Sequence, residues 1–466
     1  MNASSLSEIA IVGAGFSGTL VAAHLLRQAR TPLTIHLIDR DPQQFGRGVA
    51  YSSTLGCHLL NVPAANMSAF PDQPQHFLRW AEAREASLLD PPWVTEIGPT
   101  SFLPRRAYGD YLCWLLDEAE RAAAAGVRLE RWIDKARGLT LMPEGVVLEL
   151  ASGVRLRVAK AVLALGNFPP GNPPVADPGF YRSARYHRNP WRPGVLTALL
   201  ETESCLLIGS GLTMVDWAIT LNQAGYRGTI HIVSRRGLWP KPHRLGPPAA
   251  CAIDPERDPP SVRVWLRAIR RHSEAGDWRA VIDALRPHNQ TLWQRLPPAE
   301  QRRFLRHLRP FWDLHRHRVA PVVAERLQAL AESGQVVRHV GRIRAYRESG
   351  DGVTVSLQAR DGGRPSTLRV QAVVNCSGSE SNYRRLESAL VRDLLGRGLV
   401  RPDALALGLE AGPEGALVGA DGTLSDRLFT LGPPKKGLLW ETTAVPEVRV
   451  QAARLAAFLL GEADRR

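Results

Sequence analysis

The sequence predicts an α/β fold with two similar lobes, because it contains two strand–turn–helix segments with nearly the same glycine pattern. In the first segment, an apolar strand leads into the turn Gly13-Ala14-Gly15-Phe16-Ser17-Gly18. In the second, it leads into Gly209-Ser210-Gly211-Leu212-Thr213, with Met214 in place of a third glycine. Such turns let the backbone approach a pyrophosphate at the positive N-terminus of the following helix. The two segments therefore predict two Rossmann-like dinucleotide-binding lobes.

The residue that closes the second strand of each segment predicts which dinucleotide is bound. Asp39 stands 26 positions after Gly13, and Arg235 stands 26 positions after Gly209. A carboxylate accepts hydrogen bonds from ribose hydroxyl groups, whereas Arg235 and Arg236 would bind a 2′-phosphate. We therefore expect FAD in the first lobe and NADPH in the second. The expected cofactor-binding residues are Gly13, Gly15, Phe16, Ser17, Gly18, Asp39, Arg40, Gly209, Gly211, Leu212, Thr213, Ser234, Arg235, Arg236, Gly432 and Thr443.

The order of the predicted strands indicates that the NADPH lobe is inserted in the FAD lobe. We expect residues 1–190 to form the first part of the FAD lobe, 191–345 the NADPH lobe with a helical insert at about 252–335, and 346–466 the second part of the FAD lobe. The apolar strand at 372–378 is expected to lead back into the FAD lobe. Two β-meanders are expected, at 146–157 and 353–370.

The C-terminal part ends in a predicted helix. It is expected to start at Thr442-Thr443, with a threonine as cap and Pro446 in its first turn, after a buried strand that ends at Gly432. The positive N-terminus of this helix would stabilise negative charge at the N1/C2 edge of a reduced flavin. A packed terminal helix without that role is the alternative.

Composition restricts the other classes of protein. The chain has 466 residues, 44% of them hydrophobic, and no apolar run of the roughly 18 residues that span a bilayer. The first strand begins at Glu8, leaving no room for a signal peptide, so we expect a cytoplasmic protein. The five cysteines form no CxxC or CxxxxC pair, which argues against a disulfide reductase. Metal-ligand spacing is also missing, and no metal is expected.

The net charge of +14, from 59 Lys and Arg against 45 Asp and Glu, has two main explanations, with nucleic-acid binding as a third alternative. It reflects either a compositional habit or anionic cofactors together with an anionic substrate. No basic motif for nucleic acid is evident, and the oligomeric state stays open, with a homo-oligomer one alternative. The candidates for binding a substrate carboxylate are Arg47, His315, Arg316 and Arg318, with Arg105 and Arg106 as further candidates; a solvated helix face is the alternative for the 315–318 run.

These features resemble the two-dinucleotide-binding-domain flavoproteins over nearly the whole chain. Within them, the chain is similar to the class B flavin-dependent monooxygenases and to the bacterial FAD/NAD(P)-binding group that includes aspartate N-monooxygenases. Two further stretches carry the resemblance. Residues 181–191 match the spacing of the linker fingerprint FxGxxxHxxxW, with Tyr181 and Ser183 replacing its Phe and Gly. The segment around Asn61-Val62-Pro63 resembles the one that places an asparagine beside the reactive edge of the flavin.

The resemblance implies an NADPH-using monooxygenase that N-hydroxylates a small carboxylate-bearing amine. In such enzymes NADPH reduces FAD, and O2 adds at C4a to form a hydroperoxyflavin. By the same resemblance, Asn61 would contact the flavin and its oxygen adduct, and His187 would belong to the hinge between the lobes. The alternatives are an FAD/NAD(P)H oxidoreductase that inserts no oxygen and a nucleotide-binding redox sensor. The sequence leaves the identity of the substrate open.

Overall fold

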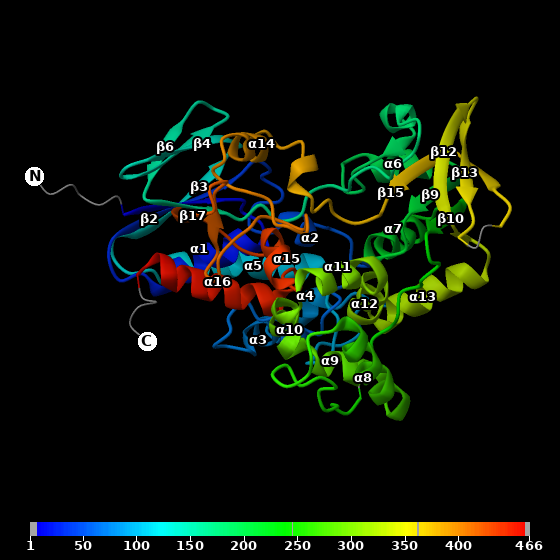
Figure 1. Ribbon diagram of the computed structural model, residues 1–466, viewed down its shortest axis with the longest axis horizontal. Coiled ribbons are helices and arrows are strands. Elements are labelled where there is room, and N and C mark those ends of the chain that lie inside the picture. Colours follow the sequence, from blue (N-terminus) through cyan, green and yellow to red (C-terminus); the bar gives the residue numbers. More distant parts are fainter. Residues whose placement is uncertain (1–6, 245, 361–362, 462–466) are drawn as a thin grey trace, which may run out of the picture.

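The computed structural model describes residues 7–244, 246–360 and 363–461. Figure 1 shows two sheets in separate lobes, with a group of helices beneath their junction. Among the described residues, no helix is both long and apolar enough to cross a bilayer.

The first lobe is built on a six-stranded sheet in the order β16-β17-β7-β1-β2-β3. Its strands are parallel apart from the β16–β17 pair. They are β1 (Glu8–Val12), β2 (Leu33–Asp39), β3 (Val127–Ile133), β7 (Lys160–Leu163), β16 (Ala416–Val418) and β17 (Leu424–Thr430). Because β16 and β17 come from the C-terminal part, the chain returns to this lobe, as the sequence predicts. On this sheet α1 (Phe16–Gln28) packs against α5 (Arg105–Arg121) and the terminal helix α16 (Val445–Leu459).

The second lobe contains a five-stranded parallel sheet in the order β11-β10-β9-β15-β8. Its strands are β8 (Tyr186–His187), β9 (Ser204–Ile208), β10 (Thr229–Ser234), β11 (Val336–Val340) and β15 (Ala372–Asn375). The helices of this lobe are α6 (Val195–Leu200), α7 (Leu212–Gln223) and α13 (Pro321–Glu332).

The strand β15 differs from our expectation. We expected this segment to lead back into the first lobe, but it pairs with β9, and Val373 stands opposite Leu206. The second sheet therefore extends to residue 375, beyond the division expected near residue 345. The physical reason is that a short, fully buried apolar run fits the centre of either parallel sheet, so the run does not specify its partners.

Each lobe also carries a three-stranded antiparallel sheet, and both predicted meanders are confirmed. The first contains β4 (Ala136–Met142), β5 (Gly145–Leu150) and β6 (Arg155–Val158), with α14 (Ala389–Gly396) against β4. The second contains β12 (Arg342–Ser349), β13 (Gly352–Gln358) and β14 (Ser366–Val370).

The helical insert follows β10 in sequence but packs against the C-terminal part of the first lobe. Its apolar core, which includes Trp265 and Trp293, also includes Leu407 and Trp440. The insert comprises α8 (Val262–Ala275), α9 (Trp278–Ala284), α10 (Asn289–Arg295), α11 (Pro298–His307) and α12 (Arg309–Arg316). The short helices of the first lobe are α2 (Gly48–Tyr51), α3 (His76–Glu82), α4 (Glu85–Leu88) and α15 (Lys436–Leu439). The insert, which follows a strand of the second lobe in sequence, thus packs against the first lobe.

Candidate functional site

The first glycine-rich turn has the geometry of a phosphate-binding loop. Gly13 has a φ of 106°, and a Cβ atom there would overlap the carbonyl oxygen of Ala164, just after β7. A Cβ atom at Gly18 would overlap the carbonyl oxygen of Gly13. Gly15 precedes the first residue of α1, Phe16, so the free N–H groups of the first helical turn lie at this loop. The loop therefore leaves room for a pyrophosphate where side chains would fill it.

Asp39 is held at this turn by two backbone N–H groups. Its Oδ2 accepts a hydrogen bond from the N–H of Ala14 at 2.9 Å, and its Oδ1 accepts one from Asp41 at 3.2 Å. Two carboxylate oxygens have about four acceptor positions in total, so acceptor capacity remains for ribose hydroxyl groups. Arg40 is exposed beside it.

The C-terminal segment reaches the same turn at Gly432. This residue has a φ of 71°, and a Cβ atom there would lie 2.8 Å from Oγ of Ser17. Thr442 Oγ1 donates to the carbonyl oxygen of Gly432 at 2.9 Å, and Gln451 Nε2 donates to Thr442 Oγ1 at 2.8 Å. The start of α16 is therefore fixed against the N-terminus of α1.

The predicted threonine cap of α16 is wrong. The helix begins at Val445 after Ala444 and has no side-chain cap, although Pro446 does occupy its first turn. Thr442 bonds Gly432 instead, and Thr443 is exposed. The side-chain hydroxyl group of Thr442 donates to the carbonyl oxygen of Gly432 in the neighbouring loop, which also accepts a hydrogen bond from the N–H of Lys435 at 2.9 Å, so both acceptor positions of this buried oxygen are used.

The second turn repeats the geometry of the first. Gly209 has a φ of 104°, and its N–H donates to Val233 at 2.8 Å, as that of Gly13 does to Ile38 at 2.8 Å. A Cβ atom at Gly209 would lie 2.7 Å from the carbonyl oxygen of Cys376. Gly211 has open space around it, and Leu212 and Thr213 begin α7. Met214 is buried at the position of the missing third glycine.

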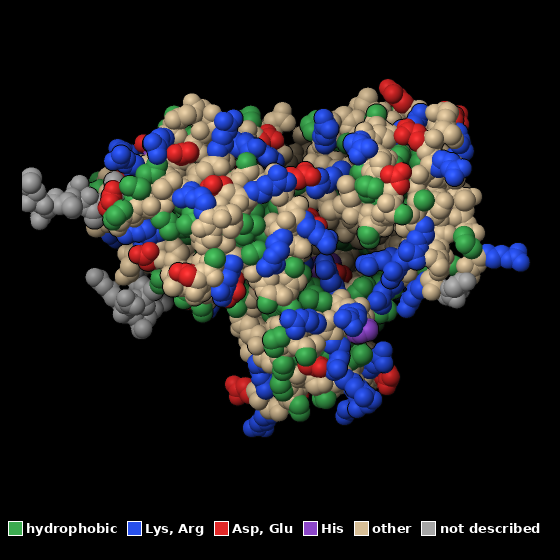
Figure 2. All heavy atoms as spheres, turned by 45° about the horizontal axis from the view of Figure 1, so that its top comes forward, with side chains coloured by type: hydrophobic (Ala, Val, Ile, Leu, Met, Phe, Trp, Pro, Cys, Tyr) green, Lys and Arg blue, Asp and Glu red, His purple; other side chains and the backbone are tan. Residues whose placement is uncertain are grey.

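Four arginines gather where β10 ends. The pKa of Arg235 is lowered by partial desolvation and by the positive charges of Arg342, Arg236 and Arg309. Arg235 and Arg342 form no ion pair within the described part of the chain. The guanidinium group of Arg236 lies 5.2 Å from the ring centre of Phe311 in the insert. Ser234 Oγ accepts a hydrogen bond from Gly237, which closes the turn after β10. Figure 2 shows basic side chains gathered at the junction of the second lobe and the insert.

Asn61 belongs to the first lobe and lies against the second lobe, in a small cavity that it shares with Leu212 and Asp216 of α7. The side-chain amide of Asn61 has no hydrogen-bond partner among the residues that the structure describes. The backbone carbonyl oxygen of Asn61 accepts a hydrogen bond from Nε2 of His243 at 3.0 Å. Burial lowers the pKa of His243 to about 4, with a further lowering by Arg318. A carbonyl oxygen only accepts, so this neutral imidazole carries its proton on Nε2.

The backbone of His243 is hydrogen-bonded next to two of the predicted substrate residues, Arg316 and Arg318. His243 N–H donates to the carbonyl of Val319, just after Arg318. Arg316 is 7% and Arg318 is 2% exposed, and each keeps two buried nitrogen atoms without a hydrogen-bond partner. Arg318 pairs with Asp283. Buried guanidinium N–H groups require acceptors, so these two side chains are suited to receive an anion.

Glu447 in the first turn of α16 links this cluster to the first lobe. It forms a two-point pair with Arg286, at 2.9 and 3.2 Å, and lies 3.5 Å from Arg316. Burial tends to raise the pKa of the nearby Glu441, but His317 and Arg316 reverse this and hold it low. His243 thus connects the Asn61 segment to Arg316 and Arg318, and Glu447 connects Arg316 to the start of α16.

The other two predicted substrate residues lie elsewhere. Arg47 belongs to the first lobe and pairs with Asp110 at 2.6 Å. His315 turns its Nδ1 to the carbonyl oxygen of Phe311 at 2.7 Å and its ring edge to Trp278. The helix α12 ends at Arg316, and Arg318 lies in the segment that follows it, so His315 turns away on the helix while Arg316 and Arg318 enter the cluster.

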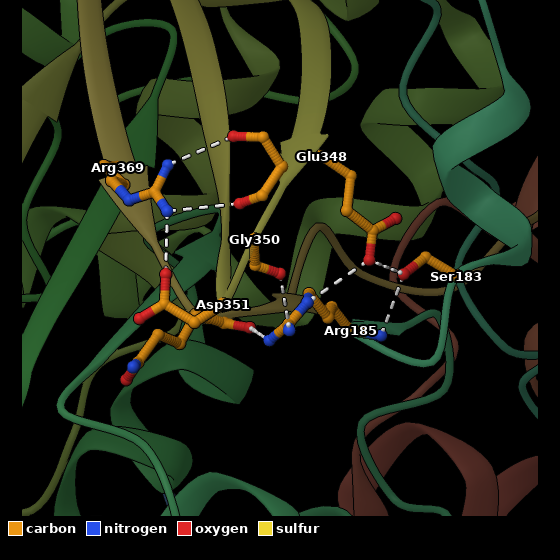
Figure 3. A network of polar contacts seen from close by, with 8 residues as sticks. Ser183, Arg185, Glu348, Gly350, Asp351 and Arg369 are labelled. Atoms are coloured by element: carbon orange, nitrogen blue, oxygen red, sulfur yellow. Dashed lines mark hydrogen bonds and ion pairs between the residues drawn. The ribbon is translucent and has the colours of Figure 1, made fainter.

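His187 is placed on β8 at the edge of the second sheet, where it pairs with Val374. Burial and Arg192 lower its pKa. In the described chain it makes no hydrogen bond or ring contact with residues 57–61. Figure 3 shows how the same linker is fastened to the second lobe: Ser183 Oγ donates to Glu348 at 2.9 Å, and Arg185 forms an ion pair with Glu348 at 3.2 Å. In the same view Arg369 pairs with Asp351 at 2.7 Å.

Several site residues escaped the sequence analysis. His243 and Arg286 have no local motif, because only the packing of the insert brings them to Asn61 and Glu447. Arg105, considered as a carboxylate binder, is instead paired with Asp216 of the second lobe. Among the described residues, no group of three or more metal-binding side chains is present.

Comparisons with known proteins agree with this architecture. The FAD-NAD(P)-binding family model matches residues 10–168. The chain is 30% identical over 238 residues to nitrosuccinic acid synthase of Aspergillus oryzae, covering 46% of this chain and 35% of that protein. It is 28% identical over 253 residues to the nitrosuccinate-forming L-aspartate N-monooxygenase of Streptomyces davaonensis, covering 46% and 38%. The matches thus span little more than a third of the length of these relatives.

Among solved structures, ornithine hydroxylase from Pseudomonas aeruginosa superimposes with a TM-score of 0.65 at 16% identity, over 98% of this chain and 99% of that one. This likeness extends to both lobes and the insert, so it establishes the whole fold. The chain therefore contains an FAD/NAD(P)-binding domain, is homologous over part of its length to aspartate N-monooxygenases, and has the fold of the N-hydroxylating class B flavin monooxygenases.

Proposed function

We propose that the protein is an FAD-dependent, NADPH-using monooxygenase that N-hydroxylates a small carboxylate-bearing amine. The observation that carries this proposal is the buried pair Arg316 and Arg318 beside the Asn61 segment and the start of α16. The partial homology to two proteins named for forming nitrosuccinate or nitrosuccinic acid supports the same class of substrate.

The residues present fit both cofactors. For FAD, Gly13 and Gly18 leave the space that a Cβ atom would fill, and Asp39 supplies a ribose acceptor. For NADPH, Gly209 and Gly211 leave a similar opening, and Arg235 and Arg236 supply positive charge for a 2′-phosphate. When bound, FAD would supply the redox chemistry, the transfer of electrons from NADPH to O2.

The residues of this chain would orient the amine. Arg316 and Arg318 would each pair with a carboxylate oxygen and so fix the distance from the carboxylate to the nitrogen. Oxygen transfer to nitrogen requires a free electron pair on the amine. In that respect the neutral His243 adds no positive charge beside Asn61. The side-chain amide of Asn61 is free to donate toward the reacting oxygen.

The proposed substrate class is tested by comparing a set of amines as substrates. Purified protein with FAD and NADPH is given L-aspartate, L-ornithine, L-lysine or no amine, and NADPH consumption, O2 uptake and N-oxygenated product are measured. We expect product with L-aspartate and not with the two diamino acids, whose second ammonium group would face the arginines. No stimulation and no product with any carboxylate-bearing amine would refute the proposal.

Two variants separate binding from oxygen transfer. Arg316→Met should raise KM for the amine about 10-fold to 150-fold, the equivalent of one charge-assisted contact of about 1.5–3 kcal/mol. Asn61→Ala should keep FAD and its reduction by NADPH but divert turnover to H2O2. H2O2 release by the unaltered protein, independent of any amine, would instead favour an oxidoreductase without oxygen insertion. FAD binding without NADPH oxidation would favour a redox sensor.

The proposed location is the cytoplasm. All five cysteines are unpaired, as is usual in a reducing compartment.

A further inference from the structure

We propose that Arg105 and Asp216 are positioning residues that set the NADPH-binding helix against the Asn61 segment. This inference rests on the proposed function, because it concerns hydride delivery from one bound cofactor to the other. Neither residue belongs to a glycine-rich turn or to the arginine cluster.

The Arg105–Asp216 ion pair joins the two lobes and fixes both the distance and the relative orientation of the helices that carry the two residues. Arg105 is the first residue of α5 in the first lobe, and Asp216 lies on α7 in the second. Arg105 Nη1 donates to Asp216 Oδ2 at 2.8 Å, and Nη2 donates to Oδ1 at 3.0 Å. The side chains are 18% and 11% exposed, so water screens the pair only weakly. Two parallel hydrogen bonds fix the orientation of the guanidinium plane of Arg105 relative to the carboxylate plane of Asp216, which a single hydrogen bond does not.

The third donor of the same guanidinium group holds the Asn61 segment. Arg105 Nε donates to the carbonyl oxygen of Leu59 at 3.2 Å, two residues before Asn61. The backbone N–H of Arg105 donates to His58 at 2.7 Å. One side chain therefore binds α7 and the residue-57–61 segment at the same time.

A second contact one helical turn further along α7 repeats this connection. Nε2 of the buried His58 lies 2.7 Å from Oγ1 of Thr220, and its Nδ1 lies 2.7 Å from Oγ of Ser53. The His58 ring also meets Trp191 of the linker edge-on, with ring centres 5.9 Å apart. Residues 216 and 220 lie on one face of a helix, so both contacts act on the same side of α7.

The consequence follows from where α7 begins. Its first residue, Leu212, follows Gly211 in the proposed pyrophosphate site, and Asp216 is one turn away. Whatever fixes Asp216 also fixes the phosphate end of the coenzyme relative to Leu59 and Asn61. Hydride transfer is sensitive to displacements of about 1 Å, which cost up to about 100-fold in rate.

The test compares Asp216→Asn, Arg105→Gln and the double variant in the FAD-loaded protein. The matched control is Arg106→Gln: Arg106 is the next residue of α5, but it pairs with Asp90 of its own lobe, so the structure does not place it at the candidate carboxylate site. Flavin reduction by NADPH is followed by anaerobic stopped flow, and reduction of the same samples by dithionite serves as a reference that needs no lobe alignment. Hydrogen–deuterium exchange is measured in residues 57–61 and in α7.

We expect each single variant to slow reduction by NADPH about 10-fold to 100-fold, with dithionite reduction unchanged. The double variant should be no slower than the slower single variant, because both changes remove one interaction. Exchange should rise in both segments, and Arg106→Gln should behave like the unaltered protein. If Asp216→Asn does not fold, Arg105→Lys, which keeps the charge without the two-point geometry, takes its place.

Reduction rates within twofold of the unaltered protein, together with unchanged exchange, would overturn the proposal. Equal slowing by NADPH and dithionite would overturn it too, because the effect would then concern the flavin site and not lobe alignment. If NADPH does not reduce the unaltered protein, the proposed function fails, and the exchange data alone decide whether the pair fixes the two segments.

Discussion

Coenzyme choice gives the most direct test of the second lobe. We predict that Arg235→Ala lowers the preference for NADPH over NADH, measured as the ratio of the two kcat/KM values. Arg235 has no ion-pair partner in the described chain, and three neighbouring arginines lower its pKa after partial desolvation, so its charge is free for an incoming phosphate. One charge-assisted contact contributes about 1.5–3 kcal/mol, which predicts a loss of about 10-fold to 150-fold in that ratio.

Arg236→Ala should have a smaller effect. Its guanidinium group already lies 5.2 Å from the ring centre of Phe311, and this contact must be weakened or shared when the phosphate binds. A cation–π contact of this kind contributes about 0.5–1 kcal/mol at an exposed site, so the expected loss is smaller by about twofold to fivefold. Removing Arg235 should leave the melting temperature unchanged or slightly higher, because it relieves repulsion among like charges.

The assay is steady-state NADPH and NADH oxidation under one buffer condition, since salt weakens contacts of this kind. Arg227→Ala is the control: Arg227 is an exposed arginine near the opposite end of β10. The reasoning is refuted if the unaltered protein uses both coenzymes equally. It is also refuted if Arg235→Ala changes the NADPH-to-NADH ratio of kcat/KM by less than twofold, as the control Arg227→Ala is expected to do.

Three further predictions concern FAD and pH. Asp39→Ala should weaken FAD binding about 10-fold or more, measured by flavin fluorescence, because Ala14 and the ribose both lose a charged acceptor. Gly18→Ala should abolish FAD retention, because its Cβ atom would overlap the Gly13 carbonyl oxygen. The free energy of unfolding should fall as the pH falls from 6.5 to about 4, and His243→Gln should make that fall shallower.

The sign of the pH effect follows from proton binding. The folded protein keeps His243 neutral down to about pH 4, whereas the unfolded chain protonates it near pH 6.5. Between these values the unfolded state binds more protons, so stability rises with pH. For the FAD predictions, Gly211→Ala is the control, since a Cβ atom there meets open space. Unchanged FAD affinity in Asp39→Ala or Gly18→Ala, or parallel pH curves for His243→Gln, would contradict the corresponding prediction.

The sequence predicts the two turns well because their chemistry is local. A positive φ at Gly13 or Gly209 and an apolar strand before each leave a pattern within about thirty residues. The sequence predicts the neighbours of a strand poorly where burial of apolar side chains alone determines which strands pair. The four-residue strand β15 could fill either sheet, and only the assembled lobe places it beside β9.

The candidate substrate site shows the same limit. Residue type alone was enough to name Arg316 and Arg318 as candidate carboxylate binders. It also named Arg47 and His315, which are basic residues but lie outside the cluster. What separates them is that the insert packs on the C-terminal part of the first lobe, through Trp440. No spacing rule encodes a contact between segments so far apart in the chain.

The helix α12 then has a role that neither lobe explains by itself. Arg309 at its beginning adds positive charge beside Arg235, while Arg316 at its end lies 3.5 Å from Glu447 of α16. Eight residues of helix span about 10 Å along the axis. One short rigid element therefore carries charge to both the proposed 2′-phosphate site and the proposed carboxylate site. Because a helix resists bending over so short a length, a displacement at one end is transmitted to the other. We therefore expect the docking of the insert on Trp440 to affect both proposed sites together, so the insert is part of the candidate catalytic unit.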